Sequence, residues 1–408
     1  MRVMICGGTG FIGTALSKAL LDRGDEVWIV TRQLPAAPAA GFLYVTWEEW
    51  SDNPGRWNGI DAIVNLAGES VGKRWTEETK RRILISRTQT ALHISDIVRR
   101  MDDPPKVLVS ASGISLYGHS HSPILRGKRR ARPKPGREAP PEEPMASVTA
   151  DLAGIRGFTP GRPEGREKGV ERAEEAPFGS AGLDGTDRPA SGSEPDGSDV
   201  EQLLRSMRLA GEEGSDWPAS ERERVERTAA YGWFDESSPA NPEDFLGSTV
   251  VAWEEAVDRI PVERIVKLRI SMVLGRKGGS FPLLRLPYRL FAGGRMGSGT
   301  QGFPWIHLKD MVSLILFSLD NPALSGAVNA VAPDPVNNDQ FGRTLAKVTR
   351  RPHWFHVPAS LLKLVLGEQS VLLHGQHAYP RKALDHGFVF AYPRLEDALR
   401  EVTGSSAR

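Results

Sequence analysis

Three glycines near the start of the chain have the spacing of a turn that holds a phosphate. Residues 7–13 read GGTGFIG and follow an apolar segment, residues 2–6. Gly7 and Gly10 let the backbone turn sharply beside a pyrophosphate, and Gly13 lets a following helix pack closely. The helix N-terminus supplies free N–H groups to the phosphates. This pattern predicts dinucleotide binding, and the predicted contacts from it are Gly7, Thr9, Gly10, Phe11, Ile12 and Gly13.

A basic residue ends the second apolar segment, about 20 residues beyond the glycine turn. Residues 26–31 (EVWIVT) run directly into Arg32. A chain that binds NAD carries Asp or Glu at this point for the ribose 2′-hydroxyl. A guanidinium there favours a 2′-phosphate, and therefore NADP. The alternative interpretation is an exposed arginine at the end of a strand.

The elements that must position these residues alternate between strand and helix. Helical spacing of apolar residues follows the glycine turn over 11–23, and a second helix is predicted over 76–100. Buried strands are predicted over 61–68 (DAIVNLAG), which ends in small residues that let the main chain pass a cofactor, and over 106–112 (KVLVSAS). Such units predict an α/β fold: a Rossmann-type, doubly wound parallel sheet with a ligand crevice at the carboxyl ends of its strands.

The composition argues against several other classes of protein. Lys and Arg number 52 and Asp and Glu 51, so the formal charge of +1 creates no field for nucleic acid or an anionic membrane. The single cysteine, Cys6, permits no disulfide framework and no Cys-rich metal site. No apolar stretch approaches the ~18 residues that span a bilayer. We expect a cytoplasmic protein that acts on a small molecule.

A long segment in the middle of the chain has the composition of a disordered region. Residues 119–230 are rich in Pro, Gly, Ser and charged residues, with short helices predicted only over 200–209 and 221–229. Four parts are therefore predicted: the first part of an NADP-binding Rossmann domain (1–118), a low-complexity insert (119–230), the second part of the Rossmann domain (231–275) and a smaller C-terminal substrate-side lobe (276–408).

Several motifs together resemble the extended short-chain dehydrogenases/reductases. They include GGTGFIG, VNLAGES (64–70), VSASGISLYG (109–118) and GSGTQGFPWIHLKD (297–310). More narrowly, the sequence is similar to NAD-dependent epimerase family proteins, in a cell-division-inhibitor-like branch with its own C-terminal domain. The resemblance implies NADP as cofactor. It also implies that the cofactor is contacted by Thr31, Arg32, Leu66, Ala67, Arg87 and Val273. Gly68, one of the small residues after the buried strand, and Ser110, which is also the less favoured candidate for the catalytic serine, are further predicted contacts.

The resemblance breaks down at the residues that would move a proton. Short-chain enzymes that transfer hydride use Tyr-x-x-x-Lys, in which the lysine lowers the pKa of the tyrosine. None of the six tyrosines here has a lysine four places on, and Phe245 and Thr249 stand at the expected places. Ser112 is then a candidate for the family's catalytic serine or merely a cap of a strand end. Tyr117, whose Tyr-Gly pair recurs at Tyr231, is the second catalytic candidate.

A histidine near the start of a C-terminal apolar helix has two interpretations. His307 and Asp310 precede the apolar residues 311–319, and no second ligand stands four places after His307. We therefore expect a capping, hydrogen-bonded histidine and no metal site. The glycine-rich residues 293–302 are expected to form a substrate-side loop.

Two functions are consistent with these patterns. The first is an NADP-binding, epimerase- or oxidoreductase-like enzyme that acts on a small polar substrate. The second is a non-catalytic NADP-binding protein that senses redox state or regulates a partner. They differ in whether hydride moves, and the residues leave both open.

Overall fold

The architecture is taken from a computed structural model, which describes residues 1–118, 233–357 and 375–405. The predicted low-complexity insert, its two short helices and Tyr231 lie outside the described residues. All described residues fall within one compact unit of the chain.

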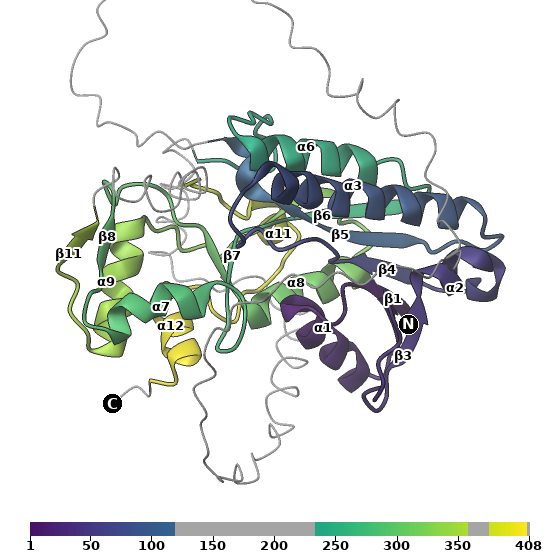
Figure 1. The fold of residues 1–408 in the computed structure, drawn as a ribbon, viewed down its shortest axis with the longest axis horizontal. Helices are drawn as coiled ribbons and strands as arrows, with labels where there is room; N and C mark the ends of the chain where they lie inside the picture. Colours follow the sequence, from purple (N-terminus) through teal and green to yellow (C-terminus); the bar gives the residue numbers. More distant parts are fainter. Residues whose placement is uncertain (119–232, 358–374, 406–408) are drawn as a thin grey trace, which may run out of the picture. The chain divides into compact units, whose positions relative to one another are not determined.

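A parallel sheet of seven strands forms the centre of this unit (Figure 1), which confirms the predicted fold class. The strand order is β10-β6-β5-β4-β1-β2-β3, so the chain changes direction across the sheet between β1 and β4. Ligands of doubly wound folds bind at the carboxyl ends of the strands near that switch point. The strands are β1 (Arg2–Cys6), β2 (Glu26–Thr31), β3 (Leu43–Thr46), β4 (Ala62–Asn65), β5 (Val107–Gly113), β6 (Arg264–Ile270) and β10 (Gly326–Ala330).

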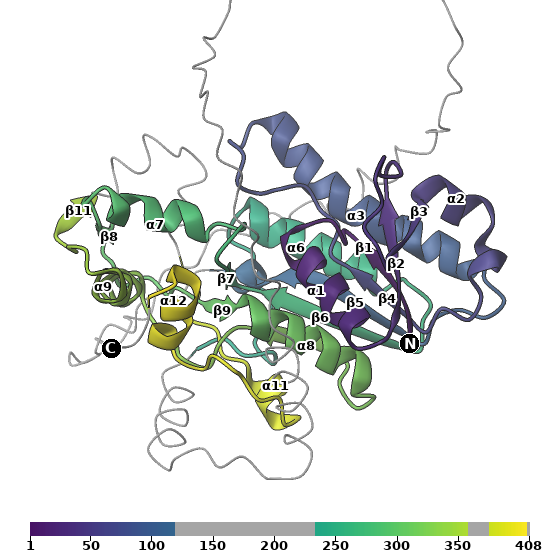
Figure 2. The same cartoon turned by 90° about the horizontal axis from the view of Figure 1, so that it is seen from below.

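Helices cover both faces of the sheet (Figures 1 and 2). Helices α1 (Phe11–Asp22) and α8 (Leu308–Asp320) cover one face, and α3 (Glu77–Arg99) and α6 (Phe245–Val257) cover the other. Alternate residues of β1 enter the two cores: Val3 and Ile5 the first, Met4 and Cys6 the second. Burial on both faces explains why the strands are continuous apolar runs. It also raises the pKa of the Cys6 thiol, which is therefore a poor nucleophile.

Smaller elements complete the described chain. Helices α7 (Phe281–Arg289), α9 (Asn338–Thr349) and α12 (Leu395–Thr403) enclose a third apolar core around Phe281, Trp305 and Leu345. The prediction of a loop over 293–302 is partly wrong, because the short strand β8 (Gly294–Met296) lies within it and pairs in parallel with β11 (Phe355–Val357). Three-residue strands carry too little periodicity to be predicted. These elements are α2 (Trp47–Asp52), β7 (Met272–Leu274), α7 (Phe281–Arg289), β8 (Gly294–Met296), β9 (Trp305–His307), α9 (Asn338–Thr349), β11 (Phe355–Val357), α11 (Arg381–Asp385) and α12 (Leu395–Thr403), with single 3₁₀ turns η1 (Pro54–Trp57) and η2 (Ile114–Tyr117).

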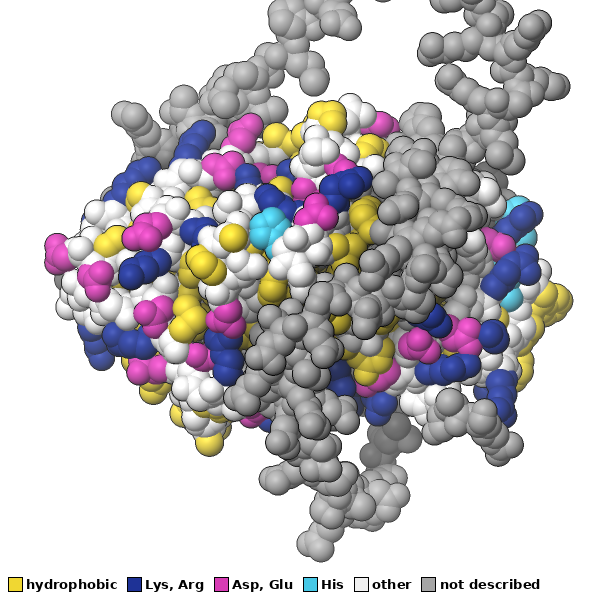
Figure 3. Space-filling model, turned by 180° about the vertical axis from the view of Figure 1, so that it is seen from behind, with side chains coloured by type: hydrophobic (Ala, Val, Ile, Leu, Met, Phe, Trp, Pro, Cys, Tyr) yellow, Lys and Arg dark blue, Asp and Glu magenta, His cyan; other side chains and the backbone are white. Residues whose placement is uncertain are grey.

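The described surface carries charges of both signs. In the face that Figure 3 shows, Lys and Arg side chains are interspersed with Asp and Glu. No helix within the described ranges is long and apolar enough to cross a membrane. The same residues contain no group of three or more His, Cys, Asp and Glu side chains placed to hold a metal ion.

The chain leaves and re-enters the described structure at two points that are close together. The ring of Tyr117 stacks on that of Phe234, with 5.2 Å between centroids and 5° between planes. Nearby, the N–H of Asn241 donates to the carbonyl oxygen of Leu116 over 2.7 Å. Residues 118 and 233 are therefore ends that a short linker can join.

Replacing residues 119–232 with a short Gly-Ser linker is expected to leave a soluble, folded protein. The sequence places no core residues in this segment, and the packing of Tyr117 on Phe234 holds its two ends together. Circular dichroism and a thermal melt of the shortened and full-length chains check this. A shortened chain that is insoluble or has lost its cooperative melt would show that the segment is part of the core.

Candidate dinucleotide-binding site

The glycine turn joins β1 to α1 with very little space around its backbone. Gly7 has a φ of +82°, and a Cβ there would lie 2.8 Å from the carbonyl carbon of Leu66. A Cβ at Gly13 would lie 2.7 Å from the Cα of Gly8. The N–H of Gly10 donates to the carbonyl oxygen of Gly7 over 3.0 Å, and α1 begins at the next residue. The first N–H groups of α1 have no partner within the helix and face outward at its N-terminus.

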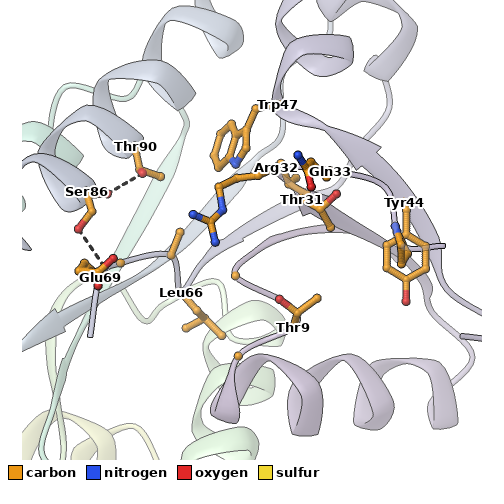
Figure 4. Close-up of a pocket in the computed structure, with 16 residues that line it drawn as sticks. Thr9, Thr31, Arg32, Gln33, Tyr44, Trp47, Leu66, Glu69, Ser86 and Thr90 are labelled. Carbon is orange, nitrogen blue, oxygen red and sulfur yellow. Dashed lines mark hydrogen bonds between the residues drawn. The ribbon is translucent and has the colours of Figure 1, made fainter. Parts of the chain in front are cut away.

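A cavity of about 810 Å³ opens at this turn, across the carboxyl ends of β1, β2 and β4 (Figure 4). Its volume lies within the range of small-molecule and cofactor sites. Eight of the residues predicted to contact the cofactor line it: Gly7, Thr9, Gly10, Thr31, Arg32, Leu66, Ala67 and Gly68. Sequence reasoning missed the others, which are Val30, Gln33, Pro35, Tyr44, Trp47, Glu69, Ser86 and Thr90.

Thr31 and Arg32 lie where β2 ends. Figure 4 shows the Arg32 guanidinium extending into the cavity, and no hydrogen bond or ion pair within the described ranges engages it. The hydroxyl of Thr31 is buried and has no hydrogen-bond partner among the described residues. A cation without a carboxylate beside an unsatisfied hydroxyl suits a ligand that brings an anion and hydrogen-bonding oxygens.

An acidic side chain in the cavity wall is neutralised by neighbouring cations. Glu69 accepts a hydrogen bond from Lys73 over 2.6 Å, and Arg82 lies 3.5 Å from the same oxygen. The hydrogen bond from Lys73 is the main reason that the pKa of Glu69 lies below its usual range. The wall therefore does not oppose an anionic ligand as an isolated carboxylate would.

Six predicted contacts do not line this cavity. Phe11 packs against the loop after β7, where a Cβ on Gly275, Gly278 or Gly279 would lie within 2.8 Å of its ring. Ser110 is fully buried, and its hydroxyl donates to the carbonyl oxygen of Ala111 over 3.1 Å. Three more of the six are packed within the protein. Val273 lies in the first apolar core, Ile12 packs against that core, and Gly13 lies against the backbone of Gly7 and Gly8. The sixth is Arg87.

Arg87 lies behind the cavity wall. A Cβ on Gly68 would lie 3.2 Å from its guanidinium carbon, which in turn lies 5.2 Å from the centre of the Trp253 ring. The guanidinium donates to the carbonyl oxygen of Ile83 over 3.0 Å. Burial lowers the pKa of Arg87 to about 10, against a smaller opposing effect of Glu69. The side chain remains charged at neutral pH, one layer away from the cavity.

Both predicted catalytic residues belong to a buried hydrogen-bonded network. Ser112 donates to Glu254 over 2.6 Å, and Tyr117 donates to Asn329 over 2.8 Å. Arg269 joins the two halves: it donates to both carboxylate oxygens of Glu254, at 2.9 and 3.0 Å, and to the Tyr117 hydroxyl at 2.8 Å. Ser112 is 5% exposed and Tyr117 0%. Both hydroxyls are therefore engaged within the protein.

The network shifts the titration of its members. Burial raises the pKa of Tyr117 to about 12, although the charge of Arg269 acts in the opposite direction. Burial also acts to raise the pKa of Glu254, but hydrogen bonds and charge from Arg269 outweigh it and the pKa is lowered. At neutral pH, Tyr117 is a neutral phenol and Glu254 a carboxylate paired with Arg269.

The places of the missing tyrosine and lysine are apolar. On α6, Phe245 packs edge-on against Trp75, with 5.7 Å between ring centroids. Thr249, one helical turn further, is 2% exposed, and its hydroxyl has no partner among the described residues. Neither side chain offers an acid or base.

His307 has the predicted capping role. As the N-cap of α8 it accepts a hydrogen bond at Nδ1 from the N–H of Lys309 over 3.1 Å, so its Nε2 carries the proton and donates to Glu401 over 3.0 Å. Asp310, which is fully buried, accepts hydrogen bonds from the N–H groups of Ala391 and Tyr392 over 2.7 and 3.0 Å. This pair ties the C-terminal segment to the start of α8.

The substitution Asp310→Asn is expected to remove part of the change in the free energy of unfolding between pH 4 and pH 7. Burial raises the pKa of Asp310 to about 6, above its ordinary value. The folded state therefore binds the proton of Asp310 more tightly than the unfolded chain does. Protonated Asp310 thus adds to the free energy of unfolding below about pH 4, and this added stability is lost as the pH rises through 6. The difference between this pKa and the ordinary value of an aspartate corresponds to roughly 3 kcal/mol of the free energy of unfolding.

Denaturant unfolding of the wild type and Asp310→Asn between pH 4 and pH 7 checks this, with Asp96→Asn on the exposed face of α3 as the control. The free energy of unfolding of wild type relative to Asp310→Asn should fall between the two pH values. A difference that stays constant would show that Asp310 does not titrate in this range.

The sheet order, the glycine turn and the cavity at the switch point together define a Rossmann protein of the extended short-chain dehydrogenase/reductase class. Residues 3–142 match the model of the NAD dependent epimerase/dehydratase family, and residues 357–402 match a domain of unknown function, DUF1731. The chain matches proteins of the NAD-dependent epimerase family over nearly its full length, which confirms the resemblance found in the sequence.

Relatives align over nearly the whole chain. Epimerase family protein YfhF of Bacillus subtilis (strain 168) is 29% identical over 406 residues, with 98% of each chain covered. The crystal structure of human epimerase family protein SDR39U1 (isoform 2) with NADPH has a TM-score of 0.67 at 27% identity and covers 100% of both chains. MoeE5 in complex with UDP-glucuronic acid and NAD has a TM-score of 0.59 at 16% identity, with 99% of each chain covered, and shares the fold alone.

Proposed function

We propose that the cavity binds NADP(H) and that the protein is an NADP-dependent, epimerase- or oxidoreductase-like enzyme for a small polar substrate. The observation that carries this proposal is the Arg32 guanidinium at the end of β2, which extends into the cavity and has no carboxylate partner among the described residues. NAD-binding chains carry an acid at this point. The human relative that aligns over the full chain was crystallised with NADPH.

The residues of the cavity fit the parts of such a cofactor. The glycine turn and the N-terminus of α1 would hold the pyrophosphate, because Gly7, Thr9 and Gly10 line the cavity and a helix N-terminus offers free N–H groups. A side chain at Gly7 or Gly13 would collide with the backbone of Leu66 or Gly8, so this turn requires glycine at both positions. Arg32 and the unsatisfied hydroxyl of Thr31 would hold the 2′-phosphate. The backbone after β4 would pass beside the central ribose. NADPH, when bound, supplies a hydride to a substrate carbon, and NADP⁺ accepts one.

A second function, a non-catalytic NADP-binding redox sensor or regulator, is favoured by a different observation. The hydroxyls of Ser112 and Tyr117 are engaged in the buried network, and Phe245 and Thr249 stand where the proton-transferring pair of related enzymes would be. In that case the cofactor would bind without reacting.

Incubation with NADPH carrying deuterium at either face of the nicotinamide C4 and a metabolite extract separates the two functions. Deuterium in an extract component, from one face only, is the result expected of the enzyme. Oxidation of neither labelled form across extracts from several growth conditions, with NADPH bound and no extract component isomerised when NADP⁺ replaces NADPH, is the result expected of the sensor. A chain that binds neither NADPH nor NADH would overturn both.

Replacing Tyr117 with phenylalanine is expected to leave cofactor binding unchanged and to lower stability. The phenol lies in the network and not in the cavity wall, so the Kd for NADPH should stay within about twofold of wild type. Loss of the hydroxyl leaves groups of Arg269 and Asn329 unpaired, which costs about 1–3 kcal/mol of the free energy of unfolding. Calorimetric titration and denaturant unfolding measure the two quantities.

The catalytic assignment of Tyr117 makes an opposite prediction about rate. A general acid or base contributes about 10²–10⁴-fold to turnover. Once a substrate is found, Tyr117→Phe should therefore keep kcat within about tenfold if the residue is structural. A thousandfold loss of kcat with unchanged NADPH affinity would show that the phenol carries the proton.

The proposal also covers the kind of partner, the cellular location and the domain division of the protein. A formal charge of +1 supports a small-molecule partner in preference to nucleic acid, and the single buried cysteine supports a cytoplasmic location. It also keeps the division into a cofactor-binding Rossmann domain, 1–118 with 231–275, and a substrate-side lobe within 276–408, except that β10 and α8 of the latter range belong to the Rossmann sheet and to the helix layer on its face.

A further inference from the structure

The register of the sheet edge brings an aromatic residue beside Arg32. Strands β2 and β3 are parallel, and Thr31 pairs with Thr46. The next residue of each strand, Arg32 and Trp47, therefore leaves the sheet at the same level. Both line the cavity, and Figure 4 shows the indole of Trp47 next to the Arg32 side chain.

The indole of Trp47 is held in place from several sides. It is the first residue of α2, whose start is fixed by a capping box: the N–H of Glu49 donates to the Thr46 hydroxyl over 3.1 Å, and the Glu49 carboxylate accepts from the N–H of Thr46 over 2.9 Å. The ring stacks on His93, with 5.3 Å between centroids and 24° between planes, and contacts Trp50 at 5.6 Å. Burial lowers the pKa of His93, so a neutral ring backs the indole at pH 7.

The surroundings of Trp47 differ in chemistry from the phosphate end of the cavity. Thr90 and Ser86 line the wall on α3, but their hydroxyls donate within that helix, to the carbonyl oxygens of Ser86 and Ile83 over 2.7 and 3.0 Å. Leu66 adds apolar surface. A rigid aromatic ring, an aliphatic side chain and neutral hydroxyls suit a flat, uncharged heterocycle. The anionic groups would be held by the glycine turn and Arg32.

We propose that Trp47 forms the aromatic wall against which the adenine ring of the cofactor lies, an inference that rests on the NADP(H) binding proposed above. Trp47 is thus a binding residue for the adenosine half, whereas Arg32 reads the 2′-phosphate. Stacking on an aromatic side chain does not depend on the phosphate, so Trp47 strengthens binding of NADPH and NADH alike.

The test compares Trp47→Leu and Trp47→Phe with wild type in calorimetric titrations of NADPH, NADH and adenosine 2′,5′-bisphosphate. Leucine should weaken all three about 5- to 150-fold, the range measured for loss of one aromatic stacking partner. Phenylalanine keeps a stacking face and should stay within about fivefold. Trp28→Leu is the matched control. Trp28 lies on β2, the strand next to β3, packs edge-on against Trp57 at 4.7 Å and does not line the cavity.

Three results would overturn the inference. Trp47→Leu with wild-type affinities would show that adenine lies elsewhere. Weaker binding of NADPH and the bisphosphate with unchanged NADH would show that Trp47 acts by orienting Arg32. Equal losses in Trp47→Leu and Trp28→Leu would show a general effect on the sheet edge.

A second readout does not depend on the leucine variant folding well. A stacked purine quenches indole emission, and adenosine 2′,5′-bisphosphate carries no nicotinamide that could absorb this emission. Saturating bisphosphate should therefore quench the emission of wild type and Trp28→Phe to a similar extent and that of Trp47→Phe less. Equal quenching in all three proteins would count against contact. If wild type binds none of the three ligands, the proposed NADP(H) function itself fails; if it binds them but the Trp47 variants match it, only the present inference fails.

Discussion

Replacing Arg269 with methionine is expected to lower the free energy of unfolding by about 3–5 kcal/mol. The substitution leaves the buried carboxylate of Glu254 without the two hydrogen bonds of the guanidinium, and the Tyr117 hydroxyl without its donor. Among the described residues, the nearest remaining cation is Lys267, which lies 3.5 Å from Glu254 and closer, at 2.8 Å, to Asp258. Removing one partner of a buried ion pair is much more costly than removing both.

Two measurements separate this explanation from a simple packing loss. The double variant Glu254→Leu with Arg269→Met should be more stable than Arg269→Met alone, because no unpaired charge remains. The deficit of the single variant should also shrink as pH falls. The lowered pKa of Glu254 gives the wild type stability that is present above its unfolded pKa and lost in acid. A deficit that is equal at pH 4 and pH 7 would contradict the charge argument.

Wild type is expected to bind NADPH about 10- to 100-fold more tightly than NADH, and Arg32→Ala is expected to remove that preference. A charge-assisted contact of roughly 1.5–3 kcal/mol to the 2′-phosphate gives this ratio. Affinity for NADH, which has no 2′-phosphate, should change little. Titration of both cofactors into both proteins measures the effect.

The control for this substitution is Arg56→Ala, which removes an exposed arginine that packs on Trp57 and does not line the cavity. It should retain the wild-type preference. The preference should also weaken as salt concentration rises, because part of it is an interaction between exposed charges. Equal affinities of the wild type for NADPH and NADH would contradict the assignment of Arg32.

Local sequence signals were sufficient for the nucleotide-binding end of the fold. Strands β1 and β2 have the predicted bounds, and the glycine turn lies between β1 and α1 as expected. Strand β3 and helix α2 were not predicted because they are short, although Thr46 and Glu49 carry the spacing of a capping box. That omission hid Tyr44 and Trp47 from the candidate site.

Depth within the structure was the property that the sequence did not reveal. Arg87 is a basic residue on the predicted helix, but only the packed structure places it behind Gly68 and not in the cavity wall. Ser112 and Tyr117 likewise have the residue types of catalytic groups. Their partners Glu254 and Asn329 come more than 100 residues later in the chain, and no local pattern links such positions.

The stacking of Tyr117 on Phe234 also defines a place where the chain can be rebuilt. Because residues 118 and 233 emerge side by side from a fixed aromatic pair, a folded domain whose own termini are adjacent can be spliced between them without stretching either strand of the junction. Tyr117 ends the η2 turn that directly follows β5, the strand whose neighbour β4 leads into the cavity wall. A circularly permuted fluorescent domain inserted at this junction would be attached to the strands that lead to the proposed cofactor site. The protein is therefore a starting point for a genetically encoded NADPH biosensor.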